Sequence, residues 1–332
     1  MTDGPAVCFR FGCFTGILLY CMGMNREHCS DAPAPVRIFA DLPCLGQENW
    51  PIAPATRYRI GGPARIALFP RTTTELEAAW EWAVRQPLPR LVLGGGSNVL
   101  VSDAGFPGVV LVTTELLGIQ DLGQDRYRVA AGEPLDRLVR EVMLLRNYSG
   151  VGALTGIPGT VGGAIFMNAG TVNGAICDFL DSVLVFGPEG PRRIPMDAVL
   201  YGYRHQKFLR PDEVIAEGDF RFAPAETDQR TIYDHYIRRR REKQPEGWCC
   251  GSVFKNPAGD HAGRLIEACG LKGTRYGGAV ISPLHANFIM NEQSACFEDV
   301  LYLIRLARRA VQERFGIVLE PEVRIIGASE AL

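Results

Sequence analysis

One glycine-rich stretch, Leu154–Gly170, constrains the fold of this chain more than any other segment. Its sequence, LTGIPGTVGGAIFMNAG, holds five glycines among small and apolar residues. Glycine is costly in backbone entropy and is used where φ must be positive or where something approaches the backbone closely. Because buried amide groups need hydrogen-bond partners, a buried segment of this kind is expected to direct N–H groups at a flat or anionic ligand. A tight structural crossover without a ligand is the alternative.

A second glycine cluster makes ligand binding the better interpretation. Gly94, Gly95 and Gly96 are followed by Ser97 and Asn98, directly after a short apolar strand expected at residues 91–93. Consecutive backbone N–H groups in such a loop form a nest that suits a pyrophosphate. Neither GxxxxGK[ST] nor a GxGxxG that opens a helix is present, so the usual nucleotide-binding signatures do not apply. The two segments together indicate a dinucleotide.

Composition and charge exclude several classes of function. The chain of 332 residues is long enough for two or three domains, and its net charge of −2 argues against a nucleic-acid surface or a polybasic membrane contact. No run of 18 apolar residues is present, so no membrane span is expected. The ten cysteines form no CxxC pair. A metal site is therefore not expected, and the chain is predicted to be reduced and cytoplasmic.

The first 35 residues are interpreted as an N-terminal extension. Val7–Met24 resembles a weak signal peptide, but no small-residue cleavage site follows it. We expect a disordered segment or a misassigned start, with Met22 or Met24 as alternative initiators; secretion is the competing interpretation.

Strands and helices are predicted without strict βαβ alternation, which favours an α+β fold over a doubly wound sheet. Thr74 and Glu77 form an expected capping box at the start of a helix. A helical stripe is expected from Leu135 to Leu145, and a further helix is expected to begin at Asp228, after a domain boundary near Pro224. Further helices are expected at 262–268 and around 300–311, and strands at 65–69, 91–93, 109–112, 127–130, 183–186, 214–222 and 322–326.

Eight motifs, in order along the chain, resemble the UDP-N-acetylenolpyruvoylglucosamine reductase family. They cover about residues 49–327, and the short run from Tyr203 to Asp228 resembles the family's subtype that lacks an inserted loop. The motifs are TRYRIGGPA (56–64), LGGGSNVLV (93–101), GIPGTVGGAIFMNAG (156–170), YGYRHQKF (201–208), GSVFKNP (251–257), AGRLIEACGLKG (262–273), HANFIMN (285–291) and LEPEVRIIG (319–327).

The resemblance implies an architecture and two cofactors. It implies a two-lobed FAD-binding domain of the vanillyl-alcohol oxidase (PCMH) type at 36–224, with lobes at about 36–105 and 106–224. A substrate-binding α+β domain at 225–317 and a C-terminal strand at 318–332 that returns to the active site would follow. FAD is expected to be non-covalent, because the Gly94–Ser102 loop has no histidine, and NADPH to be the reductant. We expect a monomer that acts on a nucleotide sugar and binds neither nucleic acid nor membrane.

Three residues match the catalytic positions of the family. The family's substrate is an enol ether conjugated to a carboxylate. Hydride addition from flavin N5 to its β-carbon leaves negative charge on the α-carbon and the carboxylate, so a cation must stabilise this charge and an acid must protonate the α-carbon. Arg204 matches the arginine that faces the carboxylate, Ser252 the proton donor, and Glu322 the glutamate that assists charge and proton handling. Without the resemblance, these would be interpreted as a surface ion pair, a turn residue and a cross-strand ion pair.

Other positions match residues that contact the ligands. Tyr203, Lys243 and Asn256 match substrate-binding positions, of which Lys243 and Asn256 resemble the contacts to the UDP diphosphate, and one or two of Arg238–Arg241 are expected to turn toward phosphates. Gln206 stands where the family commonly has serine, Cys249 and Cys250 are expected to pack as small hydrophobes, and His285 to be structural. The matches for FAD are Gly94, Gly95, Gly96, Ser97, Asn98, Thr155, Ile157, Gly159, Gly163 and Arg324.

Two alternatives remain open at this point. A flavin oxidase of the same fold with another substrate would not need Arg204, Ser252 and Glu322 together. A non-enzymatic nucleotide-sugar binding protein would be colourless after purification.

Overall fold

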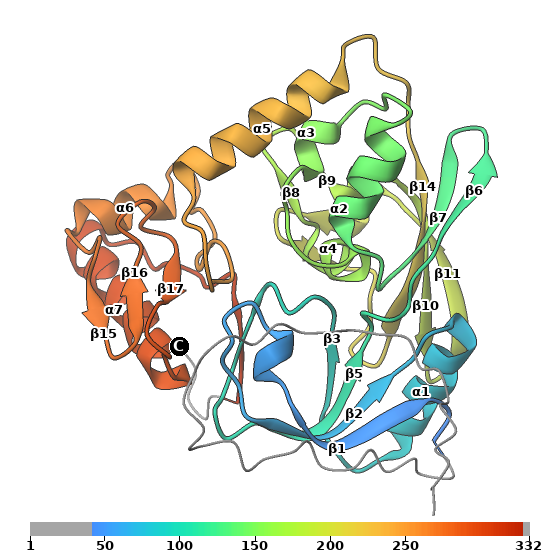
Figure 1. Ribbon diagram of the computed structural model, residues 1–332, viewed down its shortest axis with the longest axis horizontal. Helices are drawn as coiled ribbons and strands as arrows, with labels where there is room; N and C mark the ends of the chain where they lie inside the picture. The colour runs from blue at the N-terminus through green and yellow to red at the C-terminus, as the bar shows by residue number, and fades with distance from the viewer. Residues whose placement is uncertain (1–41, 328–332) are drawn as a thin grey trace, which may run out of the picture. The chain divides into compact units, whose positions relative to one another are not determined.

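A computed structural model describes residues 42–327, which belong to one compact unit. The interpretation of residues 1–35 concerns a segment outside the described residues. Helices and antiparallel and parallel strands are mixed (Figure 1), so the predicted α+β class is confirmed.

The first part of the unit is a four-stranded sheet with strand order β1-β2-β5-β3. Its strands are β1 (Leu45–Pro51), β2 (Pro63–Phe69), β5 (Phe106–Val112) and β3 (Arg90–Leu93). Strand β1 is antiparallel to β2, whereas β2 and β3 both run parallel to β5. Because β3 ends at Leu93, the Gly94–Asn98 loop follows directly from the end of a sheet strand.

Helix α1 (Thr73–Arg85) packs against this sheet through residues spaced three and four apart, Leu76, Ala79, Trp80 and Ala83. The predicted capping box at Thr74 and Glu77 is wrong by two residues. The side chain of Thr72 accepts a hydrogen bond from Glu75 N, and Glu75 Oε2 accepts one from Arg71 N. These reciprocal bonds satisfy the free amides at the helix start, so the helix begins at Thr73.

The second part is a five-stranded antiparallel sheet with order β11-β10-β14-β7-β6. Its strands are β11 (Gly190–Pro195), β10 (Leu180–Gly187), β14 (Val214–Arg221), β7 (Arg126–Ala130) and β6 (Ile119–Gly123). The side chains between this sheet, α1 and the following helices form the largest hydrophobic core of the described residues.

The predicted stripe from Leu135 to Leu145 is helical but does not stay on one face. Helix α2 (Leu135–Arg137) continues as a π-helix (Leu138–Leu144). Leu138, Val139 and Val142 are buried, whereas Leu145 is 72% exposed. The expectation that Leu145 is in the core is therefore wrong. A π-turn holds more residues than an α-turn, and the wider turn rotates this position away from the core.

The glycine-rich stretch contains two short helices rather than only a loop. They are α3 (Val151–Leu154) and α4 (Val161–Met167). Thr160 is the N-cap of α4, and its side chain accepts a hydrogen bond from Gly163 N. The segment between the helices, 155–160, remains an extended turn next to the first glycine cluster.

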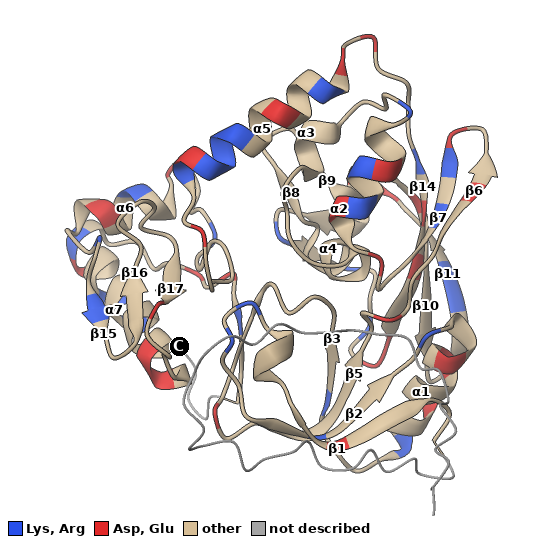
Figure 2. Cartoon of the chain, in the orientation of Figure 1, with Lys and Arg blue, Asp and Glu red and all other residues tan. Residues whose placement is uncertain are grey.

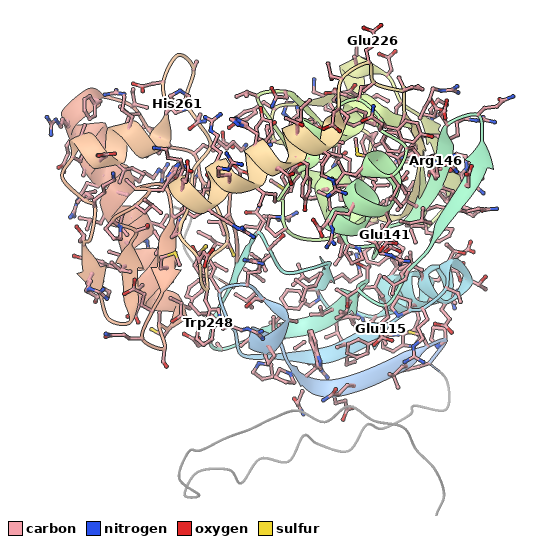
Figure 3. All side chains as sticks on the ribbon, turned by 45° about the horizontal axis from the view of Figure 1, so that its top comes forward. Glu115, Glu141, Arg146, Glu226, Trp248 and His261 are labelled. Atoms are coloured by element: carbon pink, nitrogen blue, oxygen red, sulfur yellow. The ribbon has the colours of Figure 1, made fainter. Side chains whose placement is uncertain are left out.

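The C-terminal part begins with α5 (Gln229–Lys243), whose first amides bond to the side chain of Asp228. Helix α6 (Ala262–Ala268), a three-stranded antiparallel sheet and helix α7 (Phe297–Phe315) enclose a second hydrophobic core. The sheet strands are β15 (Arg275–Tyr276), β16 (Ala279–Ile281) and β17 (Ile289–Asn291). Figure 3 shows Glu226 in the turn that precedes α5 and His261 at the start of α6.

The last described strand lies next to the first glycine cluster. Strand β18 (Arg324–Ile326) pairs in parallel with β4 (Val99–Val101), with Arg324 opposite Val99. This pairing brings Glu322 next to the Gly94–Asn98 loop. The remaining short elements are β8 (Gly170–Thr171), β9 (Gly174–Ala175), β12 (Tyr201–Gly202), β13 (His205–Gln206) and 3-10 turns at Ala53–Ala55, Ile176–Phe179 and Ala198–Leu200.

Within residues 42–327, no helix combines the length and the apolar character needed to cross a membrane.

Candidate active site

A cavity of about 1510 Å³ is lined by segments that are far apart in the sequence. Both glycine clusters, the β12–β13 hairpin, the basic end of α5, the 249–252 segment and the start of β18 contribute to its wall. It therefore gathers most of the residues that the sequence predicts for cofactor and substrate.

The two glycine clusters pack directly against each other. A Cβ added to Gly95 would lie 2.9 Å from Gly159 Cα, and one added to Gly94 would lie 2.4 Å from Thr160 Oγ1. Gly96 has φ +57, and an added Cβ would lie 2.0 Å from the carbonyl oxygen of Ala55. A side chain at Gly95 or Gly96 would push backbone segments apart, and one at Gly94 would displace the Thr160 side chain, so close packing favours glycine at all three positions.

The first glycine loop also presents free backbone donors. Among the described residues, none accepts a hydrogen bond from the N–H groups of Gly94–Asn98, although the loop lines the cavity. The space beside Gly163 is open, because a Cβ added there would have only one neighbour within 4 Å, Thr160 Oγ1 at 3.4 Å. Unpaired amides beside an open backbone surface fit the pyrophosphate and flat rings of FAD.

Two predicted cofactor side chains have structural partners. Ser97 Oγ donates to the carbonyl of Pro158 (3.2 Å), which joins the two glycine clusters. Asn98 Nδ2 donates to the carbonyl of Glu322 (3.0 Å), and the carbonyl of Asn98 accepts from Arg324 N (3.1 Å). Both residues line the cavity, and Asn98 also holds the returning C-terminal segment in place.

Not every predicted cofactor residue reaches the cavity. Ile157 and Arg324 are in its wall, but Thr155 and Gly159 are not. Thr155 is fully buried, and its hydroxyl donates to the carbonyl of Val151. Gly159 lies behind the wall, where an added Cβ would be 2.6 Å from Ser97 Oγ. Arg324 lies over the ring of Phe166, with 4.8 Å from Cζ to the ring centroid.

Arg204 and Glu322 form an ion pair in the cavity wall, with Nε 2.8 Å from Oε1. The Nε–H group is not aligned with that oxygen for a hydrogen bond, so the contact is mainly electrostatic. Arg204 Nη2 donates to the carbonyl of Gly170 (3.0 Å), which fixes the guanidinium against the glycine-rich stretch. The backbone of Arg204 has φ +58, a strained conformation for a residue with a Cβ.

Burial raises the pKa of the Glu322 carboxyl, and the nearby charges of Arg204 and Lys255 oppose this rise. The carboxyl therefore retains a proton to a higher pH than a solvated glutamate does. Glu322 N donates to the carbonyl of Val253 (2.7 Å), so the backbone of Glu322 is held against the residue that follows Ser252.

Ser252 also lines the cavity, and its hydroxyl makes no hydrogen bond to any described residue. The segment after it is held rigidly by Asn287. Val253 N donates to the Asn287 carbonyl, Phe254 N donates to Asn287 Oδ1, and Asn287 Nδ2 donates to the Phe254 carbonyl. The serine hydroxyl is thus on a fixed backbone and is available to a ligand.

The predicted substrate residues form one polar edge of the cavity. Tyr203, Lys243 and Asn256 all line it, and Tyr203 is 54% exposed. The hydroxyl of Tyr203 accepts from Asn256 N (3.4 Å), while Asn256 Oδ1 accepts from Ala262 N (3.1 Å) at the start of α6. This edge therefore joins the hairpin of the first domain to the C-terminal part.

The sequence pointed to the basic run of α5 without identifying its cavity-lining members, and it did not single out Arg57 or Phe166. Within the basic run of α5, Arg239 and Arg240 line the cavity and their neighbours Arg238 and Arg241 do not. The spacing of Ile232, Tyr236 and Arg240 by four residues was the available signal. Arg57, Phe166, Gln206 and His285 also contribute to the wall.

The cysteine pair in the cavity wall is buried. Cys249 and Cys250 pack in the second hydrophobic core, and Cys250 Sγ donates to the carbonyl of Val99 (3.2 Å). Burial raises the pKa of both thiols, which keeps them protonated and unreactive. His285 Nδ1 accepts from Asn287 N (3.2 Å), and burial lowers the pKa of its ring.

Comparisons with known proteins agree with this geometry. The profile of a family described as FAD binding domain matches residues 64–193. The profile of the UDP-N-acetylenolpyruvoylglucosamine reductase C-terminal domain matches residues 243–326. The two matches divide the chain into an FAD-binding domain of the PCMH type and a C-terminal domain characteristic of these reductases.

Relatives match most of the chain. The UDP-N-acetylenolpyruvoylglucosamine reductase of Syntrophotalea carbinolica is 42% identical over 83% of this chain and 93% of its own length. That of Synechococcus elongatus is 39% identical over 85% of this chain and 94% of its own length. The crystal structure of UDP-N-acetylenolpyruvylglucosamine reductase from Thermus caldophilus superimposes with a TM-score of 0.70 at 36% identity, over 83% of this chain and 97% of that one.

Proposed function

The chain belongs to the UDP-N-acetylenolpyruvoylglucosamine reductase family, and we propose how its own residues perform that reaction. The protein is an FAD-dependent oxidoreductase of peptidoglycan precursor synthesis. It reduces the enolpyruvyl ether of UDP-N-acetylglucosamine to UDP-N-acetylmuramate with NADPH as the reductant.

The FAD would be held along the packed glycine clusters. The free amides of Gly94–Asn98 suit its pyrophosphate, and the open surface at Gly163 and Ile157 suits its flat rings. When bound, FAD accepts hydride from NADPH and supplies it to the double bond of the substrate. The residues around it have to place the substrate, stabilise the charge that develops and deliver a proton.

The observation that carries the catalytic proposal is the ion pair of Arg204 and Glu322 beside Ser252. Arg204 is fixed by Gly170 and can face a carboxylate in the cavity. Addition of hydride to the β-carbon leaves charge on the α-carbon and the carboxylate, which this cation stabilises. Ser252 is the proposed donor of the proton to the α-carbon.

Glu322 is the proposed group that makes Ser252 a competent donor. A serine hydroxyl is a weak acid, so its proton must be replaced as it leaves. The backbone of Glu322 bonds to Val253, the residue after Ser252, and burial raises the pKa of its carboxyl, so that this group takes up a proton at a higher pH than a solvated glutamate does. Tyr203, Lys243 and Asn256 are proposed to hold the UDP diphosphate at the polar edge of the cavity.

The proposal is tested with purified holoenzyme under anaerobic conditions. NADPH should bleach the flavin absorbance near 450 nm expected for oxidised flavin, and the enolpyruvyl substrate should restore it, whereas UDP-N-acetylglucosamine should not. Colourless protein would indicate a binding protein instead. Reoxidation by oxygen with no response to the enolpyruvyl substrate would indicate a flavin oxidase.

We also propose domain limits, an oligomeric state and a cellular location for the enzyme. An FAD-binding domain at 36–224, a substrate domain at 225–317 and a returning segment at 318–332 are supported by the separate cores and by the pairing of β18 with β4. The place of β5 in the first sheet supports a lobe boundary after Val112 rather than at residue 105. Residues of one chain supply every proposed group, which supports a monomer. NADPH and nucleotide sugars are cytoplasmic substrates, which supports a cytoplasmic location.

A further inference from the structure

Helix α5 carries a charged residue on a face that otherwise packs against the glycine-rich stretch. Ile232 and Tyr236 rest on Gly152, where an added Cβ would lie 2.8 Å from Tyr236 Cε2 and 3.2 Å from Ile232 Cγ2. Arg240 follows four residues later and rests on Gly156, where an added Cβ would lie 2.6 Å from its Cδ. The absence of a side chain at Gly156 therefore makes room for an inward-facing arginine.

Arg240 has no counterion among residues 42–327. Its side chain makes one hydrogen bond there, from Nη1 to Gln244 Oε1 (3.1 Å), and it forms no ion pair with a described carboxylate. Figure 2 shows acidic residues on α5 as well as basic ones, but none of them compensates this guanidinium. Burial, together with the nearby charge of Arg204, lowers the pKa of Arg240. A desolvated cation without a partner is costly unless a ligand supplies the anion.

The two arginines that lie against the glycine-rich stretch differ in how their charge is compensated. Arg204 is neutralised by Glu322 at 2.8 Å, whereas Arg240 is not neutralised. Arg204 and Arg240 both line the cavity, and each is fixed against the glycine-rich stretch, at Gly170 and Gly156 respectively. An anion bound near both guanidinium groups would supply the counter-charge that Arg240 lacks among the described residues.

We propose that Arg240 is a second carboxylate-positioning residue, which shares the enolpyruvyl carboxylate of the substrate with Arg204. This inference rests on the proposed function. Its physical reason is the charge that develops during reduction: the carboxylate gains electron density, and Arg204 is already partly compensated by Glu322. An uncompensated, desolvated arginine stabilises that additional charge more strongly than a solvated one.

Two other anionic groups could bind to Arg240 instead, and each of them predicts a different effect of an Arg240 substitution. The pyrophosphate of FAD would make Arg240 a cofactor residue. The diphosphate of the substrate would make it a residue that does not distinguish the enolpyruvyl group. UDP-N-acetylglucosamine has the same diphosphate as the substrate but no carboxylate, so it separates these possibilities.

The test uses Arg240→Met, which keeps much of the aliphatic stem that packs on Gly156 and removes the charge. Arg238→Met is the matched control, because Arg238 is exposed on the same helix and does not line the cavity. Oxidised holoenzyme without NADPH is titrated with the enolpyruvyl substrate and, separately, with UDP-N-acetylglucosamine. Binding is followed by calorimetry, and the flavin content of each variant is measured by absorbance.

We expect Arg240→Met to weaken binding of the enolpyruvyl substrate by about 10- to 100-fold, the usual range for a lost charged hydrogen bond. Binding of UDP-N-acetylglucosamine and flavin content should stay unchanged, as should both affinities in Arg238→Met. Arg240→Lys keeps a charge and should recover part of the lost affinity. This recovery would separate loss of charge from a packing defect.

Three results would overturn the inference. Equal weakening for both ligands would assign Arg240 to the diphosphate, loss of flavin would assign it to the cofactor, and unchanged affinity for both ligands would remove it from binding. The proposed function is tested separately by the wild-type enzyme. If the wild type failed to bind or reduce the enolpyruvyl compound, that function would fail whatever the behaviour of Arg240.

Discussion

The three proposed catalytic residues are expected to act in only one half of the catalytic cycle. Ser252 faces the cavity with a free hydroxyl, and Glu322 is held beside it in an ion pair with Arg204. Reduction of the flavin by NADPH needs no proton donor for the substrate carbon. In the proposed mechanism, reoxidation by the enolpyruvyl substrate uses Arg204, Ser252 and Glu322.

Ser252→Ala should therefore leave flavin reduction nearly unchanged and slow reoxidation. Loss of a positioned general acid costs about 10²–10⁴-fold in rate, and Ser252→Cys should retain more activity than Ser252→Ala because a thiol still donates a proton. Arg204→Lys should also slow reoxidation, since lysine does not grip a carboxylate with two parallel bonds. Stopped-flow measurement of each half-reaction provides the check. Equal slowing of both half-reactions in Ser252→Ala would mean that the serine is structural.

The raised pKa of Glu322 makes a prediction about stability. The ordinary value is 4.5, and burial raises it in the folded protein. The folded state thus binds the proton more tightly than the unfolded chain. Compared with Glu322→Gln, wild-type stability is greatest below the unfolded pKa and falls as pH rises through the folded pKa. Thermal unfolding of both proteins over a pH series from about 4 upward should show that the stability of the wild type falls, relative to that of Glu322→Gln, as the pH rises. A rise in the relative stability of the wild type with pH would contradict this prediction.

At the scale of elements, the contact between the two glycine clusters determines the shape of the cofactor site. Three glycines of the first cluster meet backbone or Thr160, whereas Gly163 in α4 faces open space. A matched pair of glycine substitutions can distinguish an effect on the packing of the two clusters from an effect on the space available to FAD.

Gly95→Ala should destabilise the protein by about 1–3 kcal/mol, because its Cβ would press on Gly159 Cα and the backbone segments must separate. Gly163→Ala should leave the apoprotein as stable or stabilise it by about 0.5–1 kcal/mol, since alanine favours helix. It should nevertheless weaken FAD, because its methyl group enters the cavity. Chemical denaturation of apoprotein and flavin titration measure the two effects. Full FAD affinity in Gly163→Ala would show that the cofactor lies elsewhere in the cavity.

At the scale of the whole molecule, the cavity is lined by segments from most of the described chain, and no covalent anchor is predicted for the FAD. The loop from Gly94 to Ser102 contains no histidine. Acid precipitation of the holoenzyme should release all yellow colour into the supernatant as FAD. Colour that stays with the pellet would indicate a covalent bond.

The N-terminal extension is expected to be dispensable. The family motifs begin near Asn49, and the first sheet begins with β1 at Leu45. Deletion of residues 1–35 should leave the melting temperature and the activity nearly unchanged. Loss of soluble protein after this deletion would show that the extension packs on the rest of the enzyme.

The sequence by itself determined the class of fold, the family and most of the cavity. The glycine clusters indicate where another segment or a ligand must approach the backbone closely. Helices α5, α6 and α7 were predicted from local periodicity and capping. These signals are local: each depends on residues within a few turns of one another. The motif match adds the roles of Arg204, Ser252 and Glu322, which no local pattern provides.

Tertiary structure alone decided which of several similar residues line the cavity. Four consecutive arginines on α5 are alike in sequence, and only the packing of that helix on Gly152 and Gly156 turns Arg240 inward. The ion pair of Arg204 and Glu322 forms because β18 pairs with β4. Thr155 and Gly159 belong to the right motif but lie behind the cavity wall. Contacts between distant segments depend on how elements pack, and the periodicity of one element contains no information about its neighbours.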